Sequence, residues 1–406
     1  MNMPGHDHAA MAGHNMPAHN MAGHAMASNE AGQALMEEAS GTSVNPQSWV
    51  MPMIPARTGA WNWMFMGQAY LLDTQQSGPA GADKFYSPNW FMVEAEHAAG
   101  KGSVVFQLMA SLDPLTVTRR RYPLLFQTGE TAFGKPIVNG QHPHDLIMGA
   151  GVKYARFLTE KTMFQVYVAP VGDPALGPPA FPHRASAAEL PQATLGHHWQ
   201  DSSHIASEVI TAGISRGMFR LEASGFHGQE PNENRWNIDY GAIDSWSSRL
   251  WIAPAKKWVG QVSVGRLTHP EALEDSDIVR STASVHYTSG GWSSSLIWGR
   301  NYKTADRRAT GSLDVETVAS FRSRNFVTGR FELVDKDELP TPGTFRIGAY
   351  TAGYTRDFNL FRMVETGIGA NITAYTLPAA LKPSYGDHPF GVNFYLRFRL
   401  RQAPTP

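Results

Sequence analysis

The 406-residue sequence contains no cysteine. This absence excludes disulfide bonds, iron–sulfur clusters and thiolate metal sites, so any metal site must use histidine, methionine, carboxylate or backbone groups. The sequence also lacks an apolar run of about 18 or more residues, which excludes helical membrane spans. Its first residues contain no apolar signal core, although export to an outer membrane requires one, and we therefore expect the printed sequence to be a mature chain.

Charged residues are scarce, at 17% of the chain, and the formal net charge is only -1. Soluble proteins contain about 25% charged residues, and a near-neutral chain is a poor partner for nucleic acid. After Pro55 the sequence has no linker rich in proline, glycine and serine. We therefore predict three parts: a His/Met-rich tail over 1–28, a linker or barrel-threading segment over 29–60, and one folded domain over 61–406.

Alternating apolar and polar residues are the main positive signal. Between Trp61 and Leu400 they form segments of about ten residues, joined alternately by tight turns and long connections, which is typical of outer-membrane barrels. The last segment places on one face Val392, Phe394, Leu396, Phe398 and Leu400. Its other face carries Arg397 and Arg399, which a soluble core would not accept.

The predicted fold class is therefore all-β: a transmembrane antiparallel β-barrel of about sixteen strands with a disordered N-terminal extension. The 11 Trp, 13 Tyr and 20 Phe residues suit the aromatic girdles of such a barrel. A β-sandwich is the alternative, but it does not explain the alternating connections or outward aromatic residues such as Trp292 and Trp298. Short turns conventionally face the periplasm, so we expect the outer membrane of a Gram-negative bacterium, with the tail periplasmic.

The tail interleaves imidazole and thioether groups at a loose five-residue spacing. Its candidate metal ligands are His6, His8, His14, His19, His24, Met3, Met11, Met16, Met21 and Met26. Thioether sulfur suits soft Cu(I), whereas nickel or zinc would need the histidines but not the methionines. We predict that the tail captures copper, with Cu(I) favoured, and a flexible spacer of biased composition is the alternative.

A second group of candidate ligands lies in the long connections and at the strand ends beside them. Its members are His142, His144, Asp145, His183, His197, His198, Asp201 and His204. A barrel would bring these connections to one rim, where they could coordinate a metal or hydrogen-bond one another as a structural plug, and the residues favour neither. Alternation predicts that Asp145 shares a face with Lys153, opposite the apolar Leu146 and Met148.

A third group consists of methionines that alternation places on the strand faces lining the barrel lumen. Its members are Met64, Met66, Met92 and Met109. They follow Met51 and Met53 and could form a ladder that carries Cu(I) from the tail into the pore. Methionine more often fills irregular gaps in a core, so packing is the favoured interpretation of this group.

Two family resemblances rest on these features. The stretches QHPHDL and GHHWQDSSH, together with SGTSVNPQS, GADKFYSPNWFM and YPLLFQTGE, resemble a group of bacterial outer-membrane barrel proteins without assigned activity, over most of the chain. This resemblance implies that the loop histidines belong to a shared inward-folded structure, and it implies no reaction. The Met/His-rich extension ahead of a barrel resembles the outer-membrane copper-resistance proteins, the B-type component of periplasmic copper-resistance systems.

The predicted function is therefore copper binding, resistance or homeostasis at the outer membrane, with sequestration of copper or its passage through the barrel. The expected partners are outer-membrane lipid, the metal ion and periplasmic copper proteins, and we expect neither an organic cofactor nor enzymatic activity. A general porin or solute channel is the first alternative. An outer-membrane metalloenzyme that uses the loop histidines is the second.

Overall fold

The computed structural model describes residues 27–201, 206–272, 276–358 and 360–401. The predicted ligands of the tail and one predicted ligand of the loop group lie outside these ranges. They are the tail residues His6, His8, His14, His19, His24, Met3, Met11, Met16, Met21 and Met26, and the loop residue His204. The prediction for the tail therefore rests on the sequence.

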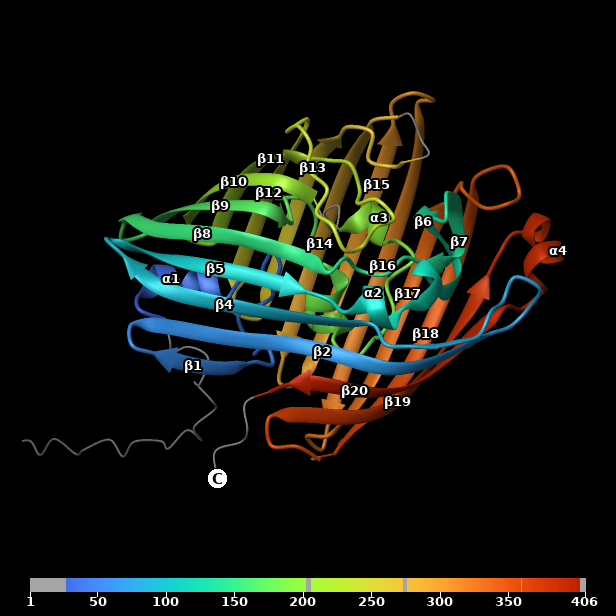
Figure 1. Cartoon of the computed structure of the whole chain (residues 1–406), viewed down its shortest axis with the longest axis horizontal. Helices are drawn as coiled ribbons and strands as arrows, with labels where there is room; N and C mark the ends of the chain where they lie inside the picture. The colour runs from blue at the N-terminus through green and yellow to red at the C-terminus, as the bar shows by residue number, and fades with distance from the viewer. Residues whose placement is uncertain (1–26, 202–205, 273–275, 359, 402–406) are drawn as a thin grey trace, which may run out of the picture.

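Most of the described residues belong to one antiparallel sheet that closes on itself (Figure 1). Within the described ranges, sixteen strands form the ring, and each pairs with the next. In ring order they are β2 (Trp61–Gln76), β4 (Asn89–Ala99), β5 (Gly102–Ala110), β8 (Ile147–Thr159), β9 (Thr162–Gly172), β10 (Ala206–Arg216), β11 (Phe219–His227), β12 (Ser245–Ala255), β13 (Trp258–Leu267), β14 (Ile278–Ser289), β15 (Trp292–Lys303), β16 (Arg308–Phe321), β17 (Asn325–Lys336), β18 (Phe345–Phe358), β19 (Val364–Thr376) and β20 (Phe390–Leu400). The ring closes where β20 pairs with β2, for example Arg397 with Tyr70. The predicted barrel is confirmed.

Four further strands in the described part of the chain lie outside this ring order. β1 (Ile54–Thr58) and β3 (Lys84–Tyr86) pair with the two ends of β2. β6 (Tyr122–Ala132) and β7 (Lys135–Gln141) form a separate hairpin with two shifts of register. Alternation did not predict this hairpin, because residues with positive φ, such as Phe126, interrupt the pleat.

The two faces of the ring differ in polarity. On β15, Leu296 and Trp298 are 49% and 41% exposed, whereas the intervening Ile297 and the neighbouring Ser295 are buried. On β14 the buried face is polar and includes His286. Large apolar side chains outside and polar side chains inside are the pattern of a barrel surrounded by lipid. A β-sandwich would bury the apolar face instead, so that alternative is wrong.

Short turns join the strands at one end of the barrel, and long connections join them at the other end. Several of the long connections contain short helices. These are α2 (Asp113–Thr116), η1 (Thr118–Arg120), η2 (Phe181–His183), η3 (Ala185–Ala187), α3 (His197–Gln200), η4 (Ala379–Leu381) and α4 (Lys382–Tyr385). Among the described residues, no helix is long and apolar enough to cross a membrane.

The connection between β9 and β10 folds back into the barrel. We call its described part, residues 173–201, the plug, and nearly all of its residues are buried. The plug contacts strands on different sides of the ring: Ala175 N donates to Ser224 on β11, and Leu195 N donates to Glu332 on β17. Its helix α3 lies inside the ring of strands in Figure 1. The plug therefore crosses the lumen.

The segment before β1 also lies inside the ring. α1 (Glu30–Met36) begins after Asn29, whose side chain caps the helix. Beyond the helix, Glu38 is buried between Lys153 of β8 at 3.3 Å and Arg220 of β11 at 2.8 Å. Because β8 and β11 are not neighbours in the ring, a carboxylate that contacts both must stand in the lumen.

Candidate functional site

The inner wall formed by β2, β4 and β5 carries a row of methionines. Met66 pairs with Met92, and Met92 pairs with Met109, so three thioether side chains lie side by side across three strands. We call the whole buried group the methionine cluster. It comprises Met51, Met64, Met66, Met92, Met109 and Met148, with Met36 and Met53 packed against it. The structure thus brings together all four methionines of the predicted ladder.

His183 of the plug adds an imidazole to the methionine cluster. Its Nε2 lies 3.1 Å from Met109 Sδ, and its ring packs on Trp90 with the ring centroids 4.4 Å apart. Burial lowers the pKa of His183 to about 3, so the imidazole is neutral at physiological pH. Neutral imidazole and thioether sulfur are the groups with which a chain without cysteine can bind Cu(I).

A cavity of about 500 Å³ lies beside the methionine cluster at the short-turn end of the barrel. Gly217 and Lys256, from the turns after β10 and β12, contribute to its wall. Its methionines are Met36, Met51, Met53, Met64, Met163 and Met218. Ala27, the first residue that the structure describes, also lines the cavity. The end of the tail therefore lies beside a wall rich in thioether sulfur.

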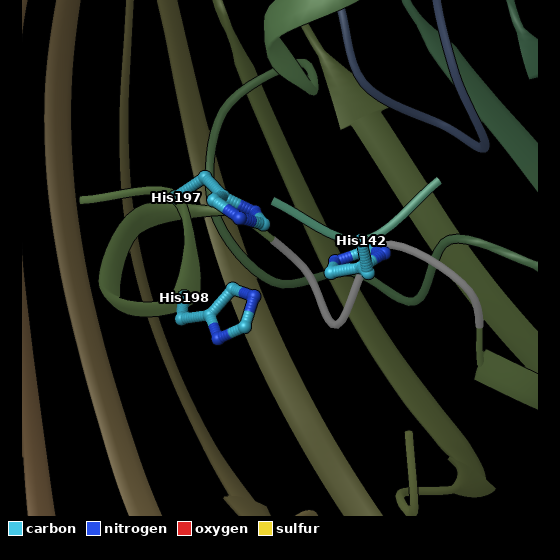
Figure 2. A group of neighbouring side chains, drawn as sticks. All are labelled: His142, His197 and His198. Carbon is cyan, nitrogen blue, oxygen red and sulfur yellow. The ribbon is translucent and has the colours of Figure 1, made fainter. Parts of the chain in front are cut away.

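Three buried histidines meet near the other end of the lumen (Figure 2). We call His142, His197 and His198 the histidine cluster. His197 and His198 belong to α3 in the plug, and His142 follows β7. The ring centroids lie 6.0 Å apart for His142 and His197, 5.9 Å for His142 and His198, and 4.0 Å for His197 and His198. One ring nitrogen from each histidine lies within 4.8 Å of the other two, which is a spacing that a metal ion could bridge.

Carboxylates surround the histidine cluster. Glu130 Oε1 lies 3.2 Å from His142 Nε2, and Glu271 Oε1 lies 3.8 Å from His198 Nδ1. Glu230 and Glu271 also form a group of possible ligands with His198. Burial raises the pKa of Glu230 well above its usual range, and the charges of Glu271 and Glu130 raise it further. Glu130 is also paired with Arg235, so Glu230 and Glu271 are the carboxylates that group with a histidine as possible metal ligands.

The other described residues of the predicted loop group are held by separate partners. His144 Nδ1 lies 2.9 Å from Asp113 Oδ2, and Asp145 and Asp201 each pair with a buried arginine, at 3.5 Å and 3.3 Å. Despite these arginines, burial raises the pKa of Asp145 to about 7 and that of Asp201 to about 6. The predicted loop group is therefore divided among the histidine cluster, His183 beside the methionines, and these pairs.

The alternation rule fails near the start of β8. The pairing of β8 with β5 shifts in register beside Met109, which breaks the regular change of faces along the strand. Met148 is buried in the methionine cluster, and Lys153 is buried in the lumen as well. The outward position expected for Met148 is therefore wrong.

The sequence reasoning missed the acidic residues around the histidine cluster. Glu130 comes from β6, Glu230 from the connection after β11 and Glu271 from the connection after β13. No spacing in the sequence links these three positions. Gln141, which precedes His142, is a separate polar residue of the cluster, and its side chain contacts His197.

A closed antiparallel ring with apolar side chains outside and a polar, plugged interior defines a bacterial outer-membrane β-barrel of the porin type. No family model matches the sequence. A search of curated proteins found no match. Among solved structures, the chain is similar to OmpF of Salmonella typhi in complex with daunomycin, with 10% identity, coverage of 86% of this chain and 100% of that chain, and a TM-score of 0.55.

Two further solved structures match with lower TM-scores. An anion-selective porin from Comamonas acidovorans is 11% identical, with 84% of this chain and 100% of that chain covered and a TM-score of 0.49. The outer-membrane channel DcaP of Acinetobacter baumannii is 9% identical, with 86% and 100% covered and a TM-score of 0.48. At such low identity, similarity shows the fold alone, and the resemblance to copper-resistance proteins stays a prediction from the sequence.

Proposed function

We propose that this outer-membrane barrel binds copper, chiefly as Cu(I), and serves copper resistance or homeostasis. The observation that carries the proposal is the methionine cluster, which faces the lumen rather than the lipid. Thioether sulfur is a soft ligand that carries no titratable proton, and a row of thioethers offers Cu(I) several equivalent positions. Leucine has a similar volume but no sulfur, so replacement of methionine by leucine separates packing from metal binding.

The position of the methionine cluster supports a proposed route for the metal. In this route the tail captures Cu(I) in the periplasm, and the cavity beside Ala27 receives it among Met36, Met51 and Met53. The row of Met66, Met92 and Met109 then leads to His183 in the plug. The barrel either holds the metal there or passes it outward.

Cu(I) titration of the full-length protein in detergent tests this proposal. The variant carries Met66→Leu, Met92→Leu and Met109→Leu, which keep the side-chain volume but remove the sulfur. Under reducing, oxygen-free conditions and in competition with a colorimetric Cu(I) chelator, the variant should bind at least one Cu(I) fewer than the unmodified protein. Met363→Leu is the control, because Met363 is 47% exposed and lies outside the methionine cluster. Equal Cu(I) binding by the triple variant and the unmodified protein would contradict the proposal.

A general solute channel is the second candidate, and the similarity to a porin favours it. In this case the lumen should conduct ions irrespective of copper, and replacement of the methionines should not change the conductance. Single-channel recording in planar bilayers, with and without Cu(I), separates the two functions. Copper-independent conductance together with unchanged Cu(I) binding in the triple variant would favour the channel.

A further inference from the structure

We propose that the histidine cluster is a second and separate metal site, which binds a divalent transition-metal ion of the Zn²⁺ or Cu²⁺ type. The site differs from the methionine cluster in its ligands, since it combines imidazole with carboxylate. The nitrogen of imidazole and the oxygen of carboxylate suit divalent Zn²⁺ and Cu²⁺ better than they suit monovalent Cu(I). The inference does not depend on the function proposed above.

The hydrogen bond of His142 fixes the proton on one of its ring nitrogens. His142 Nδ1 lies 3.0 Å from the carbonyl oxygen of Pro143. A carbonyl oxygen only accepts hydrogen bonds, so Nδ1 carries the proton and donates it. Nε2, which lies 3.2 Å from Glu130 Oε1, is then the nitrogen of His142 that would bind a metal, and the metal would displace any proton that Nε2 shares with the carboxylate.

His197 is oriented by a chain of three polar side chains. Lys336 Nζ donates to Gln127 Oε1 at 3.0 Å, so the Gln127 amide nitrogen points away and donates to Gln141 Oε1 at 2.7 Å. Gln141 Oε1 lies 3.0 Å from His197 Nε2, which must then donate its proton to this oxygen. Nδ1 is then the nitrogen of His197 that would bind a metal.

These two hydrogen bonds are the arrangement that supports histidines as metal ligands. A ligating histidine normally donates its second ring proton to a backbone carbonyl or another acceptor, which fixes the ring and its tautomer. His142 donates to a backbone carbonyl and His197 to a side-chain amide, although the two rings come from different parts of the chain.

The backbone beside the third ring is also shaped to accommodate it. Gly129, in β6, has a φ of 115°, and a Cβ atom at this position would lie 2.1 Å from His198 Cε1. Only glycine leaves room for the imidazole here. His198 then stands between this backbone and Glu271, with Glu230 as a further carboxylate. The three imidazoles supply three of the four positions of a tetrahedral Zn²⁺ site, and the fourth position can be taken by water.

Counting bound Zn²⁺ in the full-length protein tests the site. The protein is stripped with a chelator, loaded with Zn²⁺ and desalted, and bound Zn²⁺ is measured by mass spectrometry. His197→Gln and His198→Gln should each lose one Zn²⁺ equivalent relative to the unmodified protein. His144→Gln, the matched control, should lose none, because His144 pairs with Asp113 outside the cluster. The tail is present in every variant and contributes equally to all counts.

A milder variant keeps the test decisive if a histidine replacement does not fold. Gln141→Leu removes the acceptor that orients His197 and should weaken Zn²⁺ binding at this site by about 10–100-fold while the count at saturation stays the same. An unchanged Zn²⁺ count in folded His198→Gln, or an unchanged affinity in Gln141→Leu, would overturn the inference. Cu(I) binding by the methionine cluster should be unaffected in either variant, so failure of this inference and failure of the proposed function are distinguishable.

Discussion

Arg184 of the plug donates two hydrogen bonds to the carboxylate of Glu316 on β16, from Nε at 2.7 Å and from Nη2 at 3.0 Å. Both side chains are fully buried, and Glu316 also accepts a hydrogen bond from Arg330 of β17 at 3.0 Å. Two-point pairing of arginine with a carboxylate is strong and geometrically specific. This pair therefore fixes the plug to the barrel wall at one defined position.

Replacing the arginine of this pair should destabilise the plugged barrel. Arg184→Met leaves Glu316 and Asp201 without their shared cation, but Arg330 still neutralises Glu316 in part, so we expect a loss of about 3 kcal/mol in the free energy of unfolding. Urea unfolding of the protein in detergent micelles measures this loss, which should appear as a lower urea concentration at the unfolding midpoint. Arg346→Met is the control, because Arg346 is 69% exposed and its pair with Asp335 should contribute only about 0–1 kcal/mol.

The same variant should change conductance. If Arg184 holds the plug in the lumen, Arg184→Met should show more frequent or larger conductance steps in planar bilayers than the unmodified protein. Equal stability of the two arginine variants, with indistinguishable conductance traces, would show that the plug does not depend on this pair.

A second contact of the plug depends on the absence of a side chain. A Cβ atom at Gly299 of β15 would lie 2.1 Å from the carbonyl oxygen of Trp199 in α3. Gly299→Ala should therefore displace α3 and cost about 1–3 kcal/mol of unfolding free energy. At Gly311, on the adjacent strand β16, the nearest atom to such a Cβ is 3.6 Å away. Gly311→Ala should thus unfold at nearly the same urea concentration as the unmodified protein, and a matching loss in both variants would argue against the close contact.

The histidine cluster should be equally sensitive to a side chain at Gly129. Gly129→Ala would push on the His198 ring, and we expect a lower Zn²⁺ affinity in the stripped and reloaded protein. Gly134→Ala is the matched control, since Gly134 belongs to the same hairpin, also has a positive φ and has no atom within 4 Å of an added Cβ. The comparison separates displacement of the ring from backbone strain, and a similar Zn²⁺ affinity in both variants would speak against the proposed site.

The tail can be tested as a peptide of residues 1–28. At pH 5 most histidines of ordinary pKa, about 6.5, are protonated and bind metal poorly, whereas thioether sulfur is unaffected. Cu(I) binding should therefore persist at pH 5, and a peptide with leucine in place of its methionines should lose it there. Chelator competition at pH 5 and pH 7 measures both. A peptide that prefers nickel, or binds no metal, would end the copper prediction for the tail.

Strand positions were predictable because a barrel wall repeats a simple rule. Each strand must present apolar residues to lipid and polar residues to the lumen, and this period of two can be read directly from residues such as Leu396 and Arg397. The rule failed where the backbone departed from the regular pleat. A shift of register beside Met109 turned Met148 inward, and positive φ at Phe126 and Glu130 concealed the β6–β7 hairpin.

The sequence by itself determined the closed ring and the inward parity of Met66, Met92 and Met109, because alternation is a local property of each strand. Only the tertiary structure decided which of the loop histidines meet. His142 and His197 are separated by more than fifty residues, and their contact depends on how the plug folds against β15 and β16. Long connections have no periodicity, so their side-chain partners are set by packing within the lumen rather than by spacing along the chain.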